Sequence, residues 1–243
     1  MRPEWLEQMA PTEPAHVCEV DRLHKRVAAW RETRFLDLVV RREHCKELDP
    51  EAAGRALADA FAAGWFDLPK LDSPVRQFIA RVQLLSKVAP ELEIPPLDGA
   101  GIRRALTRAF HGLTLIKDAQ ATDLREAFAS HLDPAQRGFL DELLPVTLPG
   151  PGDKPLRLQY TGSPEADSDA DPEGPEALLR LTEAFAIKEH PRVAEGRLPV
   201  QLVLQAPDQK RLAVTTDFPA WRQRSYPPLR APLRAKFPGF LWP

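Results

Sequence analysis

The chain has 243 residues, enough for one large domain or for two to three small ones. Its 43% hydrophobic and 28% charged residues are typical of a globular protein, and a formal net charge of −2 argues against polyanion binding by bulk charge. Twenty-six prolines favour short elements with stiff connections over long helices.

Signals for membranes and for secretion do not occur in the sequence. No apolar run reaches about 18 residues, the length that a membrane-spanning helix needs. The first residues lack the apolar core of a secretory signal. The only two cysteines, Cys18 and Cys45, fit a reduced compartment better than a disulfide framework. We therefore expect a cytoplasmic protein that does not bind membranes.

Two or three short strands are predicted between residues 16 and 46. This stretch is rich in β-branched and aromatic residues, such as Val20, Val27, Trp30 and Phe35, and has no helical stripe of useful length. A sheet this small is not stable alone, so we expect it to pack on another element.

Helix-start signals begin at Asp49, which is expected to cap a helix that has Pro50 at its first position and stops at Gly64. Ser73 is expected to cap a second helix. Three further short helices are predicted over residues 98–110, 122–132 and 133–145. Residues 49–145 are therefore predicted to form a helical domain of short αα-hairpins.

After residue 145 the pattern becomes mixed. It predicts two strands around a Gly/Pro turn over 146–161, an acidic solvated loop over 164–176, a helix over 176–187 and a β-hairpin over 198–216. Strands and helices do not alternate as in βαβ units, so the predicted class is α+β with an antiparallel C-terminal sheet. The predicted domains are a β-rich segment 1–48, a helical domain 49–145 and a mixed domain 146–243.

Catalytic and nucleotide-binding motifs are absent from the sequence. There is no G-x-x-x-x-G-K-[ST] phosphate loop, no G-x-S-x-G elbow and no H-E-x-x-H. The Gly/Pro-rich run at 149–155 continues into Pro155 and opens no helix, so it lacks the donors that cradle a phosphate. We expect that this chain alone is not an enzyme and holds no cofactor.

A zinc site needs separate consideration. His16 and Cys18 are two residues apart on a predicted strand and share one face, whereas only one of the adjacent His44 and Cys45 can face the same way. A tetrahedral site needs three or four converging ligands. The pattern favours no metal, with Cys18 as a small buried apolar residue.

The last third of the chain carries a recognisable order of residues. A Pro…Gly-Arg-x-Pro element is matched by Pro191, Gly196, Arg197 and Pro199. Next come a leucine-rich hairpin (202–207) and a Thr-x-Asp segment leading to a Trp and a Tyr, matched by Thr215 or Thr216, Asp217, Trp221 and Tyr226. The end is basic and aromatic, with Lys236, Phe237, Pro238, Trp242 and Pro243. This order resembles the C-terminal region of bacterial HrpB-type ATP-dependent helicases of the DEAH group.

The resemblance is strongest over 178–243 and extends weakly upstream, including residues 3–11 and 26–40. Three positions depart from the family pattern: Ala186 replaces a glycine, Ala220 replaces an aromatic residue, and Pro232 interrupts the helix expected after Tyr226. The resemblance also implies an OB-like element in residues 1–48, a fold that commonly holds single strands.

The motor domains of such helicases are absent from this sequence, so ATP and Mg²⁺ are expected only in those missing domains. The resemblance implies a non-catalytic accessory module that packs on the motor and contacts single-stranded RNA. The alternative is a protein-docking scaffold without RNA affinity of its own.

Residues 211–243 hold six basic residues and one acidic residue, Asp217, with six aromatics between them. The candidates for nucleic-acid contact are Arg211, Arg222, Arg224, Arg230, Arg234, Lys236 and Trp221. Arginines would bind phosphates and aromatics would stack on bases. A core role is favoured for Trp221 and Phe237. A second basic patch over 22–46 is offset by acidic residues in the same span.

Overall fold

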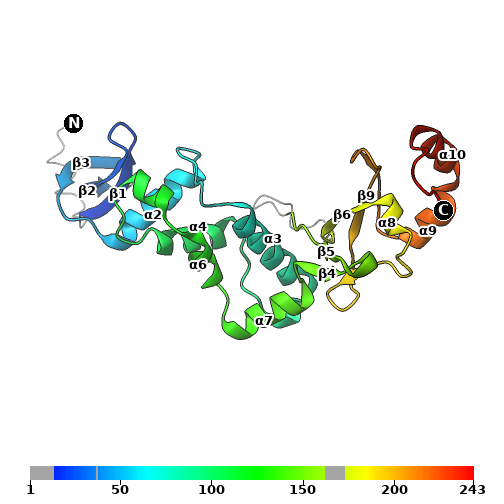
Figure 1. Cartoon of the computed structure of the whole chain (residues 1–243). Coiled ribbons are helices and arrows are strands. Elements are labelled where there is room, and N and C mark those ends of the chain that lie inside the picture. The colour runs from blue at the N-terminus through cyan, green and yellow to red at the C-terminus, as the bar shows by residue number, and fades with distance from the viewer. Residues whose placement is uncertain (1–13, 37, 162–172) are drawn as a thin grey trace. The chain divides into compact units, whose positions relative to one another are not determined.

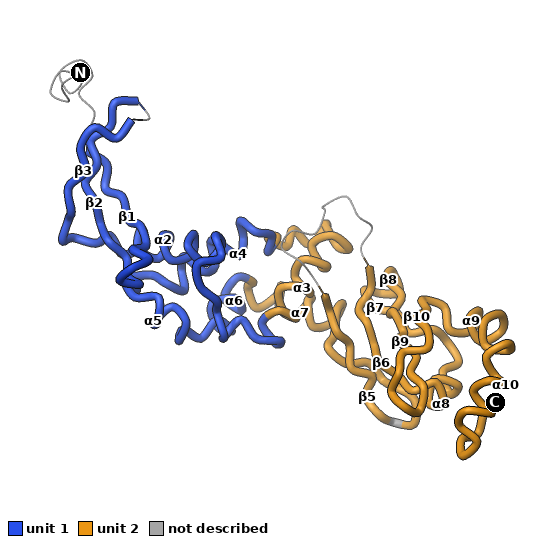
Figure 2. The backbone as a smooth tube through the Cα atoms, turned by 90° about the horizontal axis from the view of Figure 1, so that it is seen from above, with its two compact units in different colours: residues 1–75, 97–131 blue, residues 76–96, 132–243 orange. Residues whose placement is uncertain are grey.

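The computed structural model describes residues 14–36, 38–161 and 173–243, in which the chain forms two compact units (Figures 1 and 2). Unit 1 comprises residues 1–75 and 97–131, and unit 2 comprises residues 76–96 and 132–243. The helical segment predicted over 49–145 is thus shared between the units, and the three-domain division stays a prediction. The strands and helices that the structure contains confirm the predicted α+β class. The upstream resemblance at 3–11 and most of the acidic loop lie outside the described residues.

Unit 1 begins with a three-stranded antiparallel sheet, as the sequence predicted. Its strands are β1 (Ala15–Asp21), β2 (Arg26–Phe35) and β3 (Leu38–Cys45), with β2 in the centre and a bulge between Thr33 and Arg34. Val20, Val27 and Ala29 are buried. The OB-like character of this segment remains a prediction, because an OB fold has five strands and the described part of 1–48 contains three.

The sheet is attached to the helices of unit 1 by main-chain hydrogen bonds. The Val27 amide donates to the Thr114 carbonyl at 2.7 Å, and the Ile116 amide donates to the Lys25 carbonyl at 3.1 Å. These bonds satisfy polar groups at the start of β2 that would otherwise need water. The small sheet therefore packs on a helical layer, as expected.

Helix α2 (Pro50–Ala62) has the ends that the sequence predicted. Asp49 is its N-cap and accepts from the Glu51 amide, and Pro50 lies in the first turn. At the other end the Trp65 amide donates to the Ala60 carbonyl, and the Gly64 amide to the Phe61 carbonyl. This is a Schellman motif, and Gly64 adopts the left-handed backbone it requires (φ +72°).

The other helices of the described segment 49–145 are α3 (Ser73–Val88), α4 (Gly99–Ala109), α5 (Ile116–Ala121), α6 (Leu124–Ala129), α7 (Pro134–Leu143) and the 3₁₀ turn η1 (Pro90–Leu92). Helix α5 was not predicted, because it has six residues and no side chain caps its start. The predicted cap of α3 was wrong by one residue. Asp72, not Ser73, accepts the hydrogen bond from the Val75 amide.

In unit 2 a buried arginine closes the C-terminal end of α7. Arg81 is 7% exposed; its Nε donates to the Leu144 carbonyl (2.7 Å), and its guanidinium also reaches the Leu140 carbonyl (3.1 Å) and the Asp141 carboxylate (2.6 Å). Carbonyls in the last turn of a helix lack intrahelical partners, and a cation there also complements the helix dipole. Arg81 thus joins the second half of α3 to α7.

The main sheet of unit 2 has the order β10-β9-β6, formed by β6 (Glu176–Arg180), β9 (Gln201–Gln205) and β10 (Arg211–Thr215). Strands β9 and β10 form the predicted antiparallel hairpin. The predicted helix over 176–187 was wrong. Residues 176–180 pair in parallel with β9, and only the short helix α8 (Leu181–Ala184) follows. Burial alternates along β6, with Ala177 and Leu179 inside and Leu178 exposed.

Two small hairpins complete unit 2. Strands β4 (Thr147–Pro149) and β5 (Pro155–Arg157) flank the predicted Gly/Pro turn, which contains the 3₁₀ turn η2 (Pro151–Asp153). Strands β7 (Arg192–Val193) and β8 (Leu198–Pro199) flank a tight turn in which Gly196 has φ +85°. Arg197, next to that glycine, donates to the Val88 carbonyl at 2.9 Å and pairs with Glu91 at 2.6 Å. The Gly-Arg of the family pattern thus forms this turn and fixes it to the end of α3.

None of the helices in the described part of the chain is both long and apolar enough to cross a membrane.

Candidate nucleic-acid interface

The basic C-terminal segment begins with a capped helix. In α9 (Phe218–Arg224) the carboxylate of Asp217 accepts from the Ala220 amide at 3.0 Å. The Thr215 hydroxyl accepts from the Asp217 amide at 3.1 Å and donates to the Asp217 carbonyl at 2.9 Å. The Thr-x-Asp pair of the family pattern is therefore a helix-start device, and Thr215 rather than Thr216 forms it.

Aromatic rings hold α9 against unit 2. Phe218 is fully buried, and its ring lies 6.0 Å from that of Phe185 and 5.9 Å from that of Trp221, with which it stacks. Tyr226 completes the cluster at 4.8 Å from Phe185. Offset and edge-on pairs at these separations stabilise a core beyond the area that they bury. The Trp221 ring is half-buried in this cluster, so one face of it is already occupied.

His190 connects the cluster to the sheet. Its Nδ1 accepts from the Phe218 amide at 3.1 Å, so its Nε2 carries the hydrogen that reaches the Val200 carbonyl at 2.8 Å. Burial lowers the pKa of His190 below its ordinary value of 6.5. The neutral ring therefore joins the start of α9 to the chain just before β9. No pattern in the sequence indicates this role.

The end of the chain forms helix α10 (Pro227–Lys236), which contains Pro232. The interruption expected at Pro232 does not occur, since the helix continues to Lys236 and closes with a hydrogen bond from the Phe237 amide to the Leu233 carbonyl. Pro227 and Pro228 lie in the first turn, where no intrahelical donor is required.

The residues after α10 fold back onto it. The Tyr226 hydroxyl donates to the main-chain oxygen of Pro243 at 3.0 Å, and the Trp242 indole donates to the Phe237 carbonyl at 3.1 Å. Burial raises the pKa of Tyr226, which keeps this hydroxyl a donor. Trp242 is buried, and Phe237, Phe240 and Trp242 form a second ring cluster at about 6.4 Å separations.

The predicted arginines lie on the outside of these two helices. Arg222 and Arg224 are in the last turn of α9, and Arg230 and Arg234 are one turn apart on α10; all four are exposed. Arg211 is exposed at the start of β10. The six cations are thus spread over β10, α9 and α10 rather than focused on one point.

Their partners within the described residues differ. Lys236 pairs with Asp208 at 3.2 Å, Arg222 lies over the Phe185 ring at 5.1 Å, and Arg230 donates to the Trp242 carbonyl at 3.4 Å. Arg224 and Arg234 make neither an ion pair nor a side-chain hydrogen bond with any described residue. Within the described part of the chain these two positive charges are uncompensated, as is that of Arg211, and all three are available to an anion.

The second basic patch, over residues 22–46, is neutralised only in part: three of its eight cations pair with acidic residues in the described part of the chain. Arg34 pairs at 2.7 Å and Arg42 at 3.2 Å with the buried carboxylate of Glu32, and Arg41 pairs with Glu43 at 2.6 Å. Arg22 lies over the Trp65 ring at 3.7 Å. The acidic residues noted in the sequence are therefore direct partners of the arginines, which weakens this sheet as an anion site.

The thiols and imidazoles of the same sheet do not converge. Cys18 and Cys45 both pair with Ala29 from opposite sides and share its face, whereas His44 pairs with Trp30 on the other face. Burial raises the pKa of Cys18, which makes it a poor metal ligand and nucleophile. Among residues 14–36, 38–161 and 173–243, no group of three potential ligands is close enough to hold a metal ion.

Comparison with known families defines the class of this protein. The sequence profile of the HrpB_C family, described as "ATP-dependent helicase C-terminal", matches residues 106–243, which is more than half of the chain. The chain therefore belongs to this family of helicase C-terminal regions, as the resemblance of its last third predicted.

Particular relatives extend the likeness to most of the chain. The ATP-dependent RNA helicase HrpB of Escherichia coli strain K12 is 22% identical over 220 residues, covering 88% of this chain. Two crystal structures of E. coli proteins, described as the DExH-box NTPase HrpB and the DEAH/RHA helicase HrpB, match with TM-scores of 0.74 and 0.68. Their sequence identities are 21% and 20%, so they show a shared fold; they cover 99% and 97% of this chain.

The chain spans 26% of the length of that curated helicase and 29% of each of the two solved chains. The matched part is thus a C-terminal region, and the activity of the whole relatives belongs to proteins several times longer.

Proposed function

We propose that this chain is a non-catalytic accessory module of an ATP-dependent RNA helicase, and that its C-terminal arginines contact single-stranded RNA. The observation that carries the proposal is the contrast within residues 211–243. The aromatic side chains are held in two ring clusters, while Arg224 and Arg234 are exposed and unpaired among the described residues.

Contact with phosphates explains this arrangement better than stacking on bases. Phe218 and Trp242 are buried, and Trp221 stacks on Phe218, so few ring faces remain for bases. Guanidinium groups bind phosphate oxygens in a bidentate manner and need no ring surface. Arg224 and Arg234 thus bind the backbone of the strand together with Arg211, whereas Arg222, Arg230 and Lys236 are weaker contributors because they already have partners.

ATP and Mg²⁺ bind, in this proposal, only to motor domains outside this chain, and the motor is its protein partner. The chain contributes no nucleophile, acid–base pair or metal site to the reaction. It extends the path of the strand beyond the motor.

Docking without RNA contact is the rival function, and one observation favours it. Leu241 is 93% exposed and Phe240 is 45% exposed, next to each other at the end of the chain. Exposed apolar side chains that lie together are typical of a protein-binding surface. A docking surface predicts association with separately purified motor domains that is insensitive to salt and is abolished in Leu241→Ser.

The test of the RNA proposal is the titration of a fluorescently labelled single strand of about 20 nucleotides with the whole chain. The variant Arg224→Gln/Arg234→Gln removes the charges on α9 and α10 that have no partner among the described residues, and it leaves the residues that contact rings and carbonyls in place. The matched control is Arg157→Gln/Lys188→Gln, which removes two exposed cations of unit 2.

Between about 50 and 200 mM salt, removing the neutralisation of one phosphate lowers the magnitude of the salt slope of log K by about 0.7. We therefore expect the tail variant to lose about 1.4 in slope and roughly 10- to 100-fold in affinity at the lowest salt, and the control to match the unsubstituted chain. Equal affinities of variant and control would overturn the assignment of Arg224 and Arg234.

A further inference from the structure

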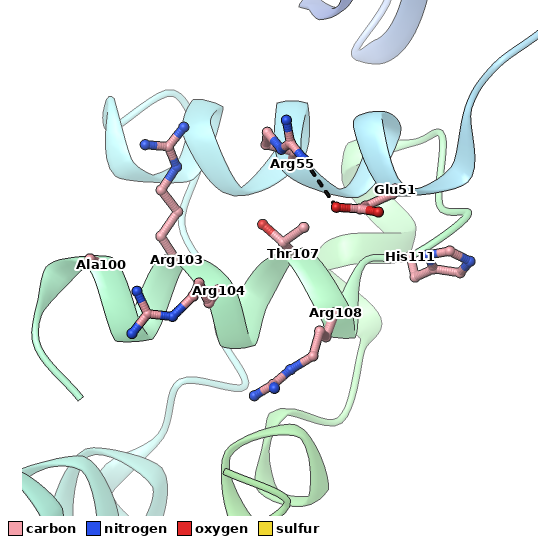
Figure 3. A pocket seen from close by; sticks show the side chains of 8 residues that line it. All are labelled: Glu51, Arg55, Ala100, Arg103, Arg104, Thr107, Arg108 and His111. Atoms are coloured by element: carbon pink, nitrogen blue, oxygen red, sulfur yellow. Dashed lines mark hydrogen bonds and ion pairs between the residues drawn. The ribbon is translucent and has the colours of Figure 1, made fainter. Parts of the chain in front are cut away.

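Unit 1 contains a hollow of about 670 Å³ between helices α2 and α4 (Figure 3). Helix α2 supplies Glu51 and Arg55, and α4 and the turn after it supply the remaining lining. Neither the tail nor the sheet of unit 1 contributes to this lining, so the hollow is a separate feature of the fold.

One face of α4 gives the hollow its chemistry. Arg104 and Arg108 lie one turn apart on α4 with Arg103 beside Arg104, and His111 follows in the turn after the helix. The opposite face, which includes Ala105 and Leu106, is buried. In the sequence this helix looks like an ordinary amphipathic helix with a solvated basic face, which is why the hollow was not predicted.

Among the residues that the structure describes, the ion pairs around the hollow leave two arginines uncompensated. Arg55 pairs with Glu51 at 3.0 Å, and Arg103 donates to the Asp59 carboxylate at 2.9 Å. Arg104 and Arg108 are exposed and form no ion pair or side-chain hydrogen bond with any described residue. The hollow thus carries an excess of positive charge concentrated on one turn of α4.

The kind of anion follows from the shape and the side chains. Arg104 and Arg108 are about 5–6 Å apart at their Cβ atoms, as residues four apart on a helix are, so each can bind a different phosphate of one strand. No Phe, Tyr or Trp is among the described residues that line the hollow, and its one ring is the small imidazole of His111, so it offers little surface for stacking a base. Contacts to phosphate and sugar position a strand without reading its sequence.

We propose that the hollow between α2 and α4 binds the sugar–phosphate backbone of a nucleic-acid strand, with Arg104 and Arg108 on successive phosphates. The site lies in unit 1 and involves none of the tail residues, so it stands whether or not the tail contacts RNA. Arg103, which pairs with Asp59, links α4 to α2, and Arg55, which pairs with Glu51 on the same helix, frames the hollow.

The experiment measures binding of labelled single-stranded RNA and DNA of the same sequence and of about 20 nucleotides to the whole chain. The variant of the hollow, called the groove variant, is Arg104→Gln/Arg108→Gln. Its matched control is Lys70→Gln/Lys117→Gln, which removes two exposed cations of unit 1 that do not line the hollow. Circular dichroism spectra of both variants establish that they fold.

We expect the groove variant to lose about 1.4 from the magnitude of the salt slope and roughly 10- to 100-fold in affinity at about 50 mM salt, for RNA and DNA alike. The control keeps the affinity of the unsubstituted chain. A groove variant that binds like its control overturns the proposal and leaves the face as a solvated surface.

The tail variant separates the two sites. Loss of affinity in the tail variant alone overturns the groove site, and loss in the groove variant alone overturns the tail assignment. Absence of binding by the unsubstituted chain at about 50 mM salt overturns both. A loss for RNA but not for DNA also contradicts the groove proposal, because it means that the 2′-hydroxyl rather than the phosphate is recognised.

Discussion

His190 determines the placement of α9, the first of the two basic helices. It accepts a hydrogen bond from the first residue of α9 and donates one to Val200. The acceptor nitrogen is lost when the ring is protonated, so the protonated form cannot keep both bonds. The position of Arg222 and Arg224 on α9 therefore depends on a neutral imidazole behind them.

This dependence predicts a loss of stability in acid. Because the folded pKa of His190 lies below 6.5, the unfolded chain binds more protons as the pH falls from about 6.5 toward the folded value. The contribution of His190 is fully present above pH 6.5 and is lost as the pH passes down through its folded pKa.

His190→Gln keeps a donor and an acceptor but does not titrate. We expect the unsubstituted chain to lose more thermal stability than this variant between about pH 7.5 and pH 5, measured by thermal melts at both values. Identical losses in the two proteins contradict the assignment, because all other groups are common to both.

At the scale of elements, β6 shows that a local pattern of apolar residues does not always distinguish a strand from a helix. Residues 176–181 contain four apolar side chains, which suit a helical face as well as a strand. Residues 176–180 form a strand because they pair in parallel with β9, which lies more than twenty residues further along the chain. By contrast, Asp49 caps α2 as predicted, because a cap depends only on its immediate neighbours.

The strand assignment has a direct test in two adjacent leucines. Leu179 is 8% exposed and Leu178 is 46% exposed. Leu179→Ala is expected to lower the free energy of unfolding by about 2–4 kcal/mol, since it opens a cavity, whereas Leu178→Ala lowers it by less than about 1 kcal/mol. Urea unfolding followed by circular dichroism measures both; similar losses would mean that both side chains are buried, as on a helix.

For the whole molecule, the sequence predicted the α+β class and the helicase family. Of the two basic surfaces it predicted the C-terminal tail but not the hollow between α2 and α4. The tail was visible because its arginines and aromatics are close together in the chain. The hollow was not visible in the sequence, because the arginines of α4 line a hollow only when α2 packs beside them. That packing depends on small residues such as Gly54, which lie far from α4 in the sequence. The two surfaces belong to different units, so their contributions are expected to be independent.

Independence makes the effects of the substitutions additive. A chain with Arg104, Arg108, Arg224 and Arg234 all changed to Gln is expected to lose about 2.8 from the magnitude of its salt slope, the sum of the two double variants. The same titration of labelled single-stranded RNA measures it. A combined variant no weaker than one of the double variants would mean that the two arginines changed only in the other double variant contribute nothing to binding.

Gly54 determines how closely α2 and α4, the two walls of the hollow, approach each other. A Cβ atom at this position would lie 2.6 Å from the Thr107 carbonyl oxygen and 3.1 Å from the Phe110 main chain, so any side chain there forces α2 and α4 apart. The spacing between the two walls is therefore set by the absence of one methyl group. In the proposed site, a substitution at this buried glycine would therefore change the affinity for a strand while every arginine is preserved.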